Sequence, residues 1–294
     1  MKVIHEHTEF SLDMIRGLPK AYYCTKNNIE HVCVVKPNLK ELYSLVSNNI
    51  KEDARTRIHN PDDIYHFEGP SFSKKEWLPP PLKDMFKDHL KFKKPTVVIN
   101  NKCASDSSTK NIFNIAKKFN LKNDLEQILS LEEKSCVNYY SIPMLSRIFD
   151  LLSNKYQILY IRPISTNKKY VKDNSKEIPF NDFEFIENNY PQVYTIKKFL
   201  EDPLCPTNNF TLAQFMFEAT SDKHLSTIGG NCKISSYFGG DVIIYQWDGW
   251  KLGSPRGKRP IFDSNSWLKK LSNANIIGMH NYNTILNYIE KNWI

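Results

Sequence analysis

Two adjacent glycines, Gly229 and Gly230, have the clearest potential for chemistry in this sequence. Apolar residues at 225–228 and 241–245 flank them, and the residues between are spaced as in a short helix. The pattern predicts a strand, a glycine turn, a helix and a second strand, which together form a compact βαβ unit. Ligands of open α/β sheets bind at the carboxyl end of such a strand, so we expect a site at the glycines.

The chemistry suited to this turn is the binding of a phosphate or diphosphate. Glycine lacks a Cβ, so the backbone can adopt positive φ and a bulky group can approach closely. The helix that follows offers Asn231, the hydroxyl of Ser235, free N–H groups and the positive end of its dipole. A turn that only allows helix and strand to pack would contain the same glycines, and short glycine motifs often occur without a ligand.

Two basic residues at the ends of other predicted strands would reach the same edge of the sheet. Asn101 and Lys102 follow the apolar run 95–99. Arg162 directly follows the apolar run 157–161 and stands before a proline. Arginine pairs bidentately with phosphate oxygens, so we expect Arg162, assisted by Lys102, to clamp a diphosphate. A solvated lysine is the other interpretation of Lys102.

Three acidic or basic side chains elsewhere are candidates for contacts with substrate. Glu218, just ahead of the glycine unit, would reach a ribose or sugar hydroxyl, and it fits a plain surface glutamate equally well. His66 and Glu68 alternate along an extended segment and therefore share one face, where either would serve as an acid or base. Both also fit a structural role in a buried turn or at the surface.

The composition is that of a folded protein with an excess of positive charge. The chain has 294 residues, 40% hydrophobic and 13% aromatic, enough for two domains with real cores. A formal net charge of +8 favours an anionic partner, such as nucleic acid, a phosphorylated small molecule or an acidic membrane surface contacted peripherally. Much of that charge also fits a solvated surface. The chain is rich in Lys, Asn and Ile, which an AT-rich coding sequence would produce by itself, without any anionic partner.

Several classes of protein are disfavoured by what the sequence lacks. No apolar run approaches the roughly 18 to 20 residues of a membrane span, and the first residues turn polar too early for a signal peptide, so we expect a cytoplasmic protein. The six cysteines include no C-x-x-C pair, which argues against a zinc site or a disulfide framework. The sequence has no D-x-D motif, which argues against metal-chelating glycosyltransferases of the single-sheet kind, and no P-loop, which argues against P-loop enzymes. It also lacks the G-x-G-x-x-G motif of Rossmann dehydrogenases, the G-x-S-x-G motif of α/β-hydrolases and the H-E-x-x-H motif of zincins.

The periodicity divides the chain into two α/β domains, at residues 1–94 and 95–294. The first domain has predicted strands at 2–5 and 31–35, helical stretches at 11–23 and 39–46, and an extended proline-rich strap at 57–84. The second has predicted strands at 95–99, 157–161, 191–196, 225–228, 241–245 and 276–279, and helices at 143–152, 183–189, 211–219 and 282–293. The helix at 211–219 should be capped by Asn208 or Asn209. A polar insertion occupies 103–135.

Three stretches of the second domain resemble a known family. They are residues 95–102 (PTVVINNK), 157–163 (QILYIRP) and 226–240 (STIGGNCKISSYFGG). In this order they are similar to glycosyltransferase-like proteins of bacterial surface-polysaccharide and viral glycan gene sets, over residues 60–290, although the insertion departs from the family's shorter form. The resemblance implies a GT-B-like α/β fold with two Rossmann-like domains and parallel sheets, a small acceptor-side domain at 1–94 and a nucleotide-sugar-binding domain at 95–294.

The sequence thus leads to the hypothesis of a metal-independent glycosyltransferase without a cofactor. It would move a sugar from a nucleotide-sugar donor to a hydroxyl of a glycan or glycoprotein, and its helix terminus and cations would neutralise the leaving diphosphate. The general base that deprotonates the acceptor would be His66, Glu68 or Asp106. Two other classes stay open: a basic nucleic-acid-binding module, and a non-catalytic transferase fold that serves as a scaffold.

Overall fold

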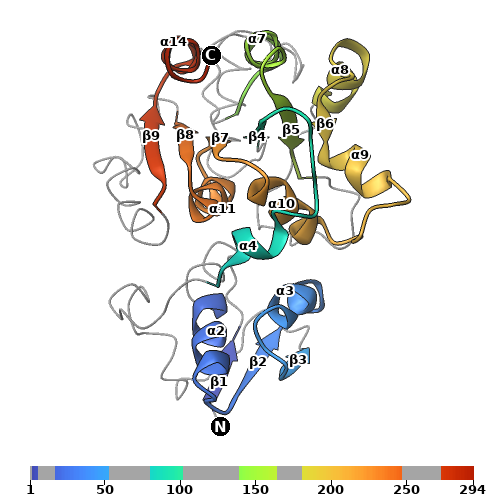
Figure 1. Cartoon of the computed structure of the whole chain (residues 1–294), viewed down its shortest axis with the longest axis vertical. Helices are drawn as coiled ribbons and strands as arrows, with labels where there is room; N and C mark the ends of the chain where they lie inside the picture. Colours follow the sequence, from blue (N-terminus) through green and yellow to red (C-terminus); the bar gives the residue numbers. More distant parts are fainter. Residues whose placement is uncertain (1, 6–16, 53–79, 102–138, 164–180, 247–272) are drawn as a thin grey trace, which may run out of the picture.

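The computed structural model describes residues 2–5, 17–52, 80–101, 139–163, 181–246 and 273–294. These residues form two parallel sheets, one of three strands and one of six (Figure 1). The predicted mixed α/β class with parallel sheets is therefore confirmed, and the six-stranded sheet is compatible with a Rossmann-like fold.

The larger sheet has the strand order of a doubly wound fold. Its strands are β4 (Thr96–Asn100), β5 (Gln157–Ile161), β6 (Tyr194–Thr195), β7 (Lys223–Thr227), β8 (Asp241–Tyr245) and β9 (Asn275–Met279). The spatial order is β6-β5-β4-β7-β8-β9, and every neighbouring pair is parallel. After β4, strands β5 and β6 follow one another on one side of it. The chain then returns to the other side of β4, where β7, β8 and β9 follow in turn. The order therefore reverses between β4 and β7, the switch point at which such sheets bind ligands.

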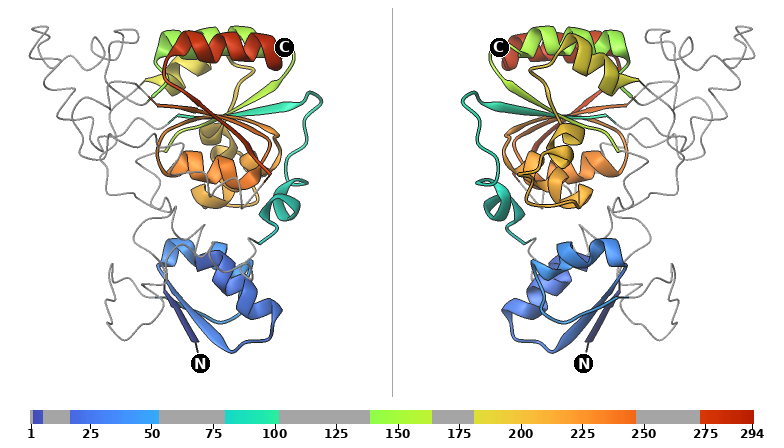
Figure 2. Two further views of the ribbon diagram at one scale, coloured as in Figure 1. Left: turned by 90° about the vertical axis from the view of Figure 1, so that its left-hand side faces the viewer. Right: turned by 90° about the vertical axis from the view of Figure 1, so that its right-hand side faces the viewer.

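Helices cover both faces of this sheet, as Figure 2 shows. One layer contains α7 (Ile142–Leu152), α8 (Asp182–Asn189) and α14 (Tyr282–Asn292). The other contains α9 (Ile196–Glu201), α10 (Phe210–Ala219) and α11 (Gly230–Phe238). Because both faces are covered, the central strands are near-continuous apolar runs, and Val97, Val98 and Ile99 are fully buried.

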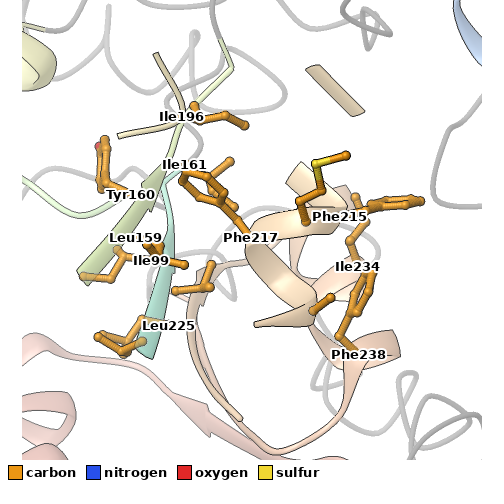
Figure 3. Close-up of a cluster of buried hydrophobic side chains, with 14 of the residues drawn as sticks. Ile99, Leu159, Tyr160, Ile161, Ile196, Phe215, Phe217, Leu225, Ile234 and Phe238 are labelled. Atoms are coloured by element: carbon orange, nitrogen blue, oxygen red, sulfur yellow. The ribbon is translucent and has the colours of Figure 1, made fainter. Parts of the chain in front are cut away.

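Helix α10 lies at the centre of the packing. All ten of its residues are buried, and Phe215 and Phe217 belong with Ile161 and Ile234 to the apolar cluster drawn in Figure 3. The side chain of Asn209 caps the helix by accepting from the N–H groups of Thr211 and Leu212, one of the two caps that the sequence predicts.

The N-terminal unit packs against this second helix layer. It comprises β1 (Lys2–His5), α2 (Leu18–Lys26), β2 (His31–Val35), the 3₁₀ turn η2 (Pro37–Leu39), α3 (Lys40–Ser44) and β3 (Ile50–Glu52). Helix α4 (Leu82–Phe86) joins it to the larger unit, with the ring of Phe86 6.1 Å from that of Phe215. Lys83 pairs with Asp222 at 2.5 Å, and the hydroxyl of Tyr237 donates to the carbonyl of Pro80 at 2.7 Å. One continuous apolar core spans both units.

The elements differ from the sequence prediction where a cap or a proline decides the local structure. Residues 57–79 of the predicted extended strap lie outside the described residues, and its last residues are helical, because α4 begins at Leu82 directly after the prolines, a position that proline tolerates. The predicted strand at 191–196 is reduced to two residues, because Thr195 accepts a hydrogen bond from the N–H of Lys198 and starts α9. The insertion at 103–135 lies outside the described residues.

Candidate functional site at the carboxyl edge of the larger sheet

The carboxyl ends of the central strands meet at one edge of the sheet. Asn100 at the end of β4 pairs with Ile161 of β5 and with Ser226 of β7. Three connecting segments, residues 102–138, 164–180 and 247–272, leave the described structure from this edge. Their sequences contain sixteen Lys or Arg against nine Asp or Glu, an excess of +7. Nearly all of the +8 formal charge of the chain therefore belongs to segments attached to this edge.

The glycine turn after β7 has a backbone that only glycine adopts readily. Gly229 has φ 148° and ψ −158° and stands at the N-cap of α11, where no side chain caps the helix among the described residues. Asn231, in the first turn, is 9% exposed, and its Nδ2 has no hydrogen-bond partner among the residues that the structure describes. The turn thus combines an uncapped helix start with a buried amide donor that lacks an acceptor.

Asn100 and Asn101 face opposite sides of the sheet, because successive residues of a strand alternate. On the α10 side, the amide of Asn100 donates to Glu218 and, at 3.0 Å, to the hydroxyl of Ser235. Ser235 Oγ lies 3.1 Å from Glu218 Oε1. The Nδ1 atom of His224 is 2.8 Å from Glu218 Oε2, without the alignment of a hydrogen bond. These four residues form a buried polar cluster beneath the edge, which we call the lower network.

On the α7 side, Asn101 belongs to a second buried network, the upper network. Its amide nitrogen donates to the hydroxyl of Tyr160 at 3.0 Å, and that hydroxyl donates to the carboxylate of Asp182. The Nε of Arg162 donates to the same Asp182 oxygen at 2.7 Å, and its guanidinium lies 4.6 Å from the ring of Phe183. Burial raises the pKa of Tyr160 well above its ordinary value and also raises that of Asp182, against the opposing charge of Arg162.

Asn101 also holds the chain that returns to the sheet after residue 138. Its Oδ1 accepts from the N–H of Tyr140 at 2.9 Å, and its Nδ2 donates to the carbonyl of Tyr140 at 3.0 Å. The hydroxyl of Tyr140 donates to the carbonyl of Ser226 at 3.2 Å. Tyr140 and Asp182 were not among the residues selected from sequence, since nothing in their neighbourhood indicates that they meet strand ends.

The structure places part of the predicted site at one edge. Asn101, Arg162, Gly229, Gly230 and Asn231 all stand at or directly after the carboxyl ends of β4, β5 and β7. Two further predicted site residues, Glu218 and Ser235, lie in the lower network and are fully buried, so Glu218 is not a surface glutamate. The remaining predicted residues, His66, Glu68, Lys102 and Asp106, lie outside the described residues.

A cysteine, a histidine and a serine come together in the N-terminal unit without forming a reactive site. Ser47 Oγ lies 3.0 Å from His31 Nε2, and burial raises the pKa of Cys33 to about 11 although a hydrogen bond from Ser47 opposes the rise. We therefore expect native Cys33 to resist alkylation by iodoacetamide at pH 8, where only about one thiol in a thousand would be ionised. Peptide mass spectrometry with an unfolded control would check this, and rapid labelling of the native protein would contradict it.

Within the described residues, no group of three or more His, Cys, Asp or Glu side chains is placed to hold a metal ion. No disulfide joins any two of the four cysteines among them, Cys24, Cys33, Cys205 and Cys232. In the same part of the chain, every helix is too short or too polar to cross a membrane. Comparisons of the sequence with protein-family models and with curated proteins, and of the structure with solved structures, gave no match.

Proposed function

We propose that this protein is a metal-independent glycosyltransferase that binds the diphosphate of a nucleotide-sugar donor at the Gly229-Gly230 turn. The observation that carries the proposal is the position of this turn. It joins β7 to the N-terminus of α11, beside the point where the strand order reverses. Doubly wound sheets bind nucleotides at this point, and helix N-termini bind phosphate. The buried, unpartnered amide of Asn231 supports the proposal, because a phosphate oxygen would supply the acceptor it lacks.

In the proposed reaction, the bond between the anomeric carbon and the diphosphate oxygen breaks, and a bond to the acceptor hydroxyl oxygen forms. The leaving diphosphate gains negative charge as this happens. The N–H groups at the start of α11 and the guanidinium of Arg162 would stabilise that charge, together with Lys102. If the anomeric configuration inverts, the acceptor proton passes to a general base, for which His66, Glu68 and Asp106 are the candidates.

In this proposal the protein acts in the cytoplasm, and its two domains bind different substrates, as in a GT-B-like enzyme. The N-terminal domain at 1–94 would bind the glycan or glycoprotein acceptor, and the domain at 95–294 would bind the donor. The parallel order β1-β2-β3 of the small sheet supports this, as does the apolar core that joins the two units. The excess positive charge in the sequences that follow β4, β5 and β8 fits a polyanion as well, so nucleic acid is the competing ligand.

The first test is calorimetric titration and thermal shift with nucleoside diphosphates and nucleotide sugars, with magnesium or with chelator. A donor at 100 times its dissociation constant should stabilise the protein by about 2.7 kcal/mol, independently of magnesium. Slow hydrolysis of the donor should then accompany binding. No stabilisation by any nucleotide would overturn the proposal. If oligonucleotides instead bind with an affinity that rises with their length and falls steeply with salt concentration, the hypothesis of a nucleic-acid-binding module replaces the glycosyltransferase proposal.

Replacing Arg162 by alanine should weaken the binding of the nucleoside diphosphate by about tenfold or more, because a charge-assisted hydrogen bond contributes about 1.5–3 kcal/mol. The affinity for the nucleoside alone should stay unchanged. Arg147→Ala is the matched control, since Arg147 is an exposed α7 residue that donates to Asn283 at 3.3 Å. Equal diphosphate affinity in the Arg162→Ala and Arg147→Ala variants would remove Arg162 from the site.

A further inference from the structure

The upper network is a continuous path of hydrogen bonds across three strands. It begins at Arg162, at the end of β5, which donates to Asp182 at the first residue of α8. Asp182 accepts from the hydroxyl of Tyr160, which in turn accepts from Asn101, the residue directly after β4. The path continues through the backbone of Tyr140, and the Tyr140 hydroxyl donates to Ser226 of β7.

The two ends of this path are the two parts of the proposed diphosphate site. Arg162 is the cation at one end, and Ser226 is three residues ahead of Gly229 at the other. The intermediate residues are out of contact with solvent: Asn101, Tyr140, Tyr160 and Asp182 are each 0% exposed. In such surroundings hydrogen bonds are directional and cooperative, and a lost partner is not replaced by water.

Asp182 occupies the pivotal position. Its oxygen Oδ2 accepts from both Arg162 and Tyr160, so the carboxylate fixes the plane of the guanidinium and the direction of the phenol together. The N-terminal position on α8 favours its negative charge. Phe183, the next residue, places its ring under the guanidinium, so α8 holds Arg162 by an ion pair and by a cation–π contact.

We infer that Asp182 is a positioning residue that orients Arg162 toward the donor and, through Tyr160, Asn101 and Tyr140, couples it to the glycine turn. The inference rests on the proposed function for the identity of the ligand, but the coupling itself is a property of the folded chain. A purely structural Asp182 would stabilise α8 without any effect at β7. Coupling instead predicts that a change at Asp182 reaches residues 226–229, two strands away.

The experiment compares Asp182→Asn and Tyr160→Phe with the control Tyr190→Phe. Tyr190 also belongs to the α7 side, and its hydroxyl bonds to Ser146 at 2.6 Å and to Asp150 at 2.8 Å. It follows the last residue of α8, at the opposite end of that helix from Asp182. Each variant has one hydrogen-bonding or charged function removed with the shape of its side chain retained. If Asp182→Asn fails to fold, Tyr160→Phe tests the same path.

Two readouts decide the matter. Asp182→Asn should weaken nucleoside diphosphate binding at least tenfold with nucleoside affinity within twofold of wild type, and Tyr190→Phe should change neither. Hydrogen–deuterium exchange should rise at 139–141 and 226–229 in Asp182→Asn and Tyr160→Phe alone. Exchange that rises only around 160–163 and 181–184, or equally in the control, would overturn the coupling. If wild type binds no nucleotide yet exchange rises at 226–229, the coupling stands and the proposed function falls.

Discussion

Replacing Gly240 by alanine is expected to lower the free energy of unfolding by about 3 kcal/mol or more, through strain and overpacking together. Gly240 has φ +76°, and an added Cβ would lie 2.2 Å from the carbonyl oxygen of Asp222 and 2.8 Å from its Cα. That carbonyl accepts the N–H of Asp241 at 2.8 Å, and the carbonyl of Gly240 accepts the N–H of Asn275 at 2.8 Å. The backbone therefore cannot move aside without loosening the starts of β7, β8 and β9.

The measurement is thermal or urea unfolding, with Gly239→Ala as the control. Gly239 also has positive φ, +87°, but no atom lies within 4 Å of its added Cβ. The control should lose only the conformational term, about 1–3 kcal/mol. Gly240→Ala should lose more, with a midpoint lower by a further ~2–4 °C for each additional kcal/mol. Equal losses in the two variants would mean that the contact with Asp222 is relieved at no cost.

The βαβ unit around these glycines could be predicted from sequence because its signals are local. Buried parallel strands are short apolar runs, and glycines at 229–230 and 239–240 mark both ends of the helix. The structure confirms β7, α11 and β8 in that order, with β7 and β8 parallel. The order of all six strands was not predictable in the same way, because it depends on contacts between residues far apart in the chain.

The face on which a side chain lies was the main limit on predicting the site. Asn100 and Asn101 are adjacent and chemically identical, yet one joins Glu218 and the other joins Tyr160. Glu218 was selected as a candidate ligand group because it precedes the glycine unit. Burial of all of α10 places it in the lower network instead. Asp182 could not be found, because only the folded sheet brings it to Arg162.

Removal of the Glu218 side chain, by Glu218→Ala, is expected to destabilise the protein by about 3–5 kcal/mol, because it removes a fully buried hydrogen-bond acceptor and leaves its volume empty. The carboxylate is fully buried beside His224, and it accepts hydrogen bonds from Asn100 and Ser235. Asn100 and Ser235 would each lose one hydrogen-bond acceptor that water cannot replace, and a cavity would remain where the α10 side chain had been. Glu218→Gln retains an acceptor and the volume, so it should cost less, about 1–2 kcal/mol.

A surface ion pair gives the comparison for this effect. Glu187 pairs with Lys197 at 2.9 Å with both side chains partly exposed, so Glu187→Ala should cost under about 1 kcal/mol. A double-mutant cycle with His224→Ala then isolates the buried pair, and we expect a coupling energy above about 1 kcal/mol. Because Asn100 stands directly under the switch point, Glu218→Ala should also weaken any ligand bound at that edge. A loss no larger than that of Glu187→Ala would mean that the lower network relaxes freely and does not brace the site.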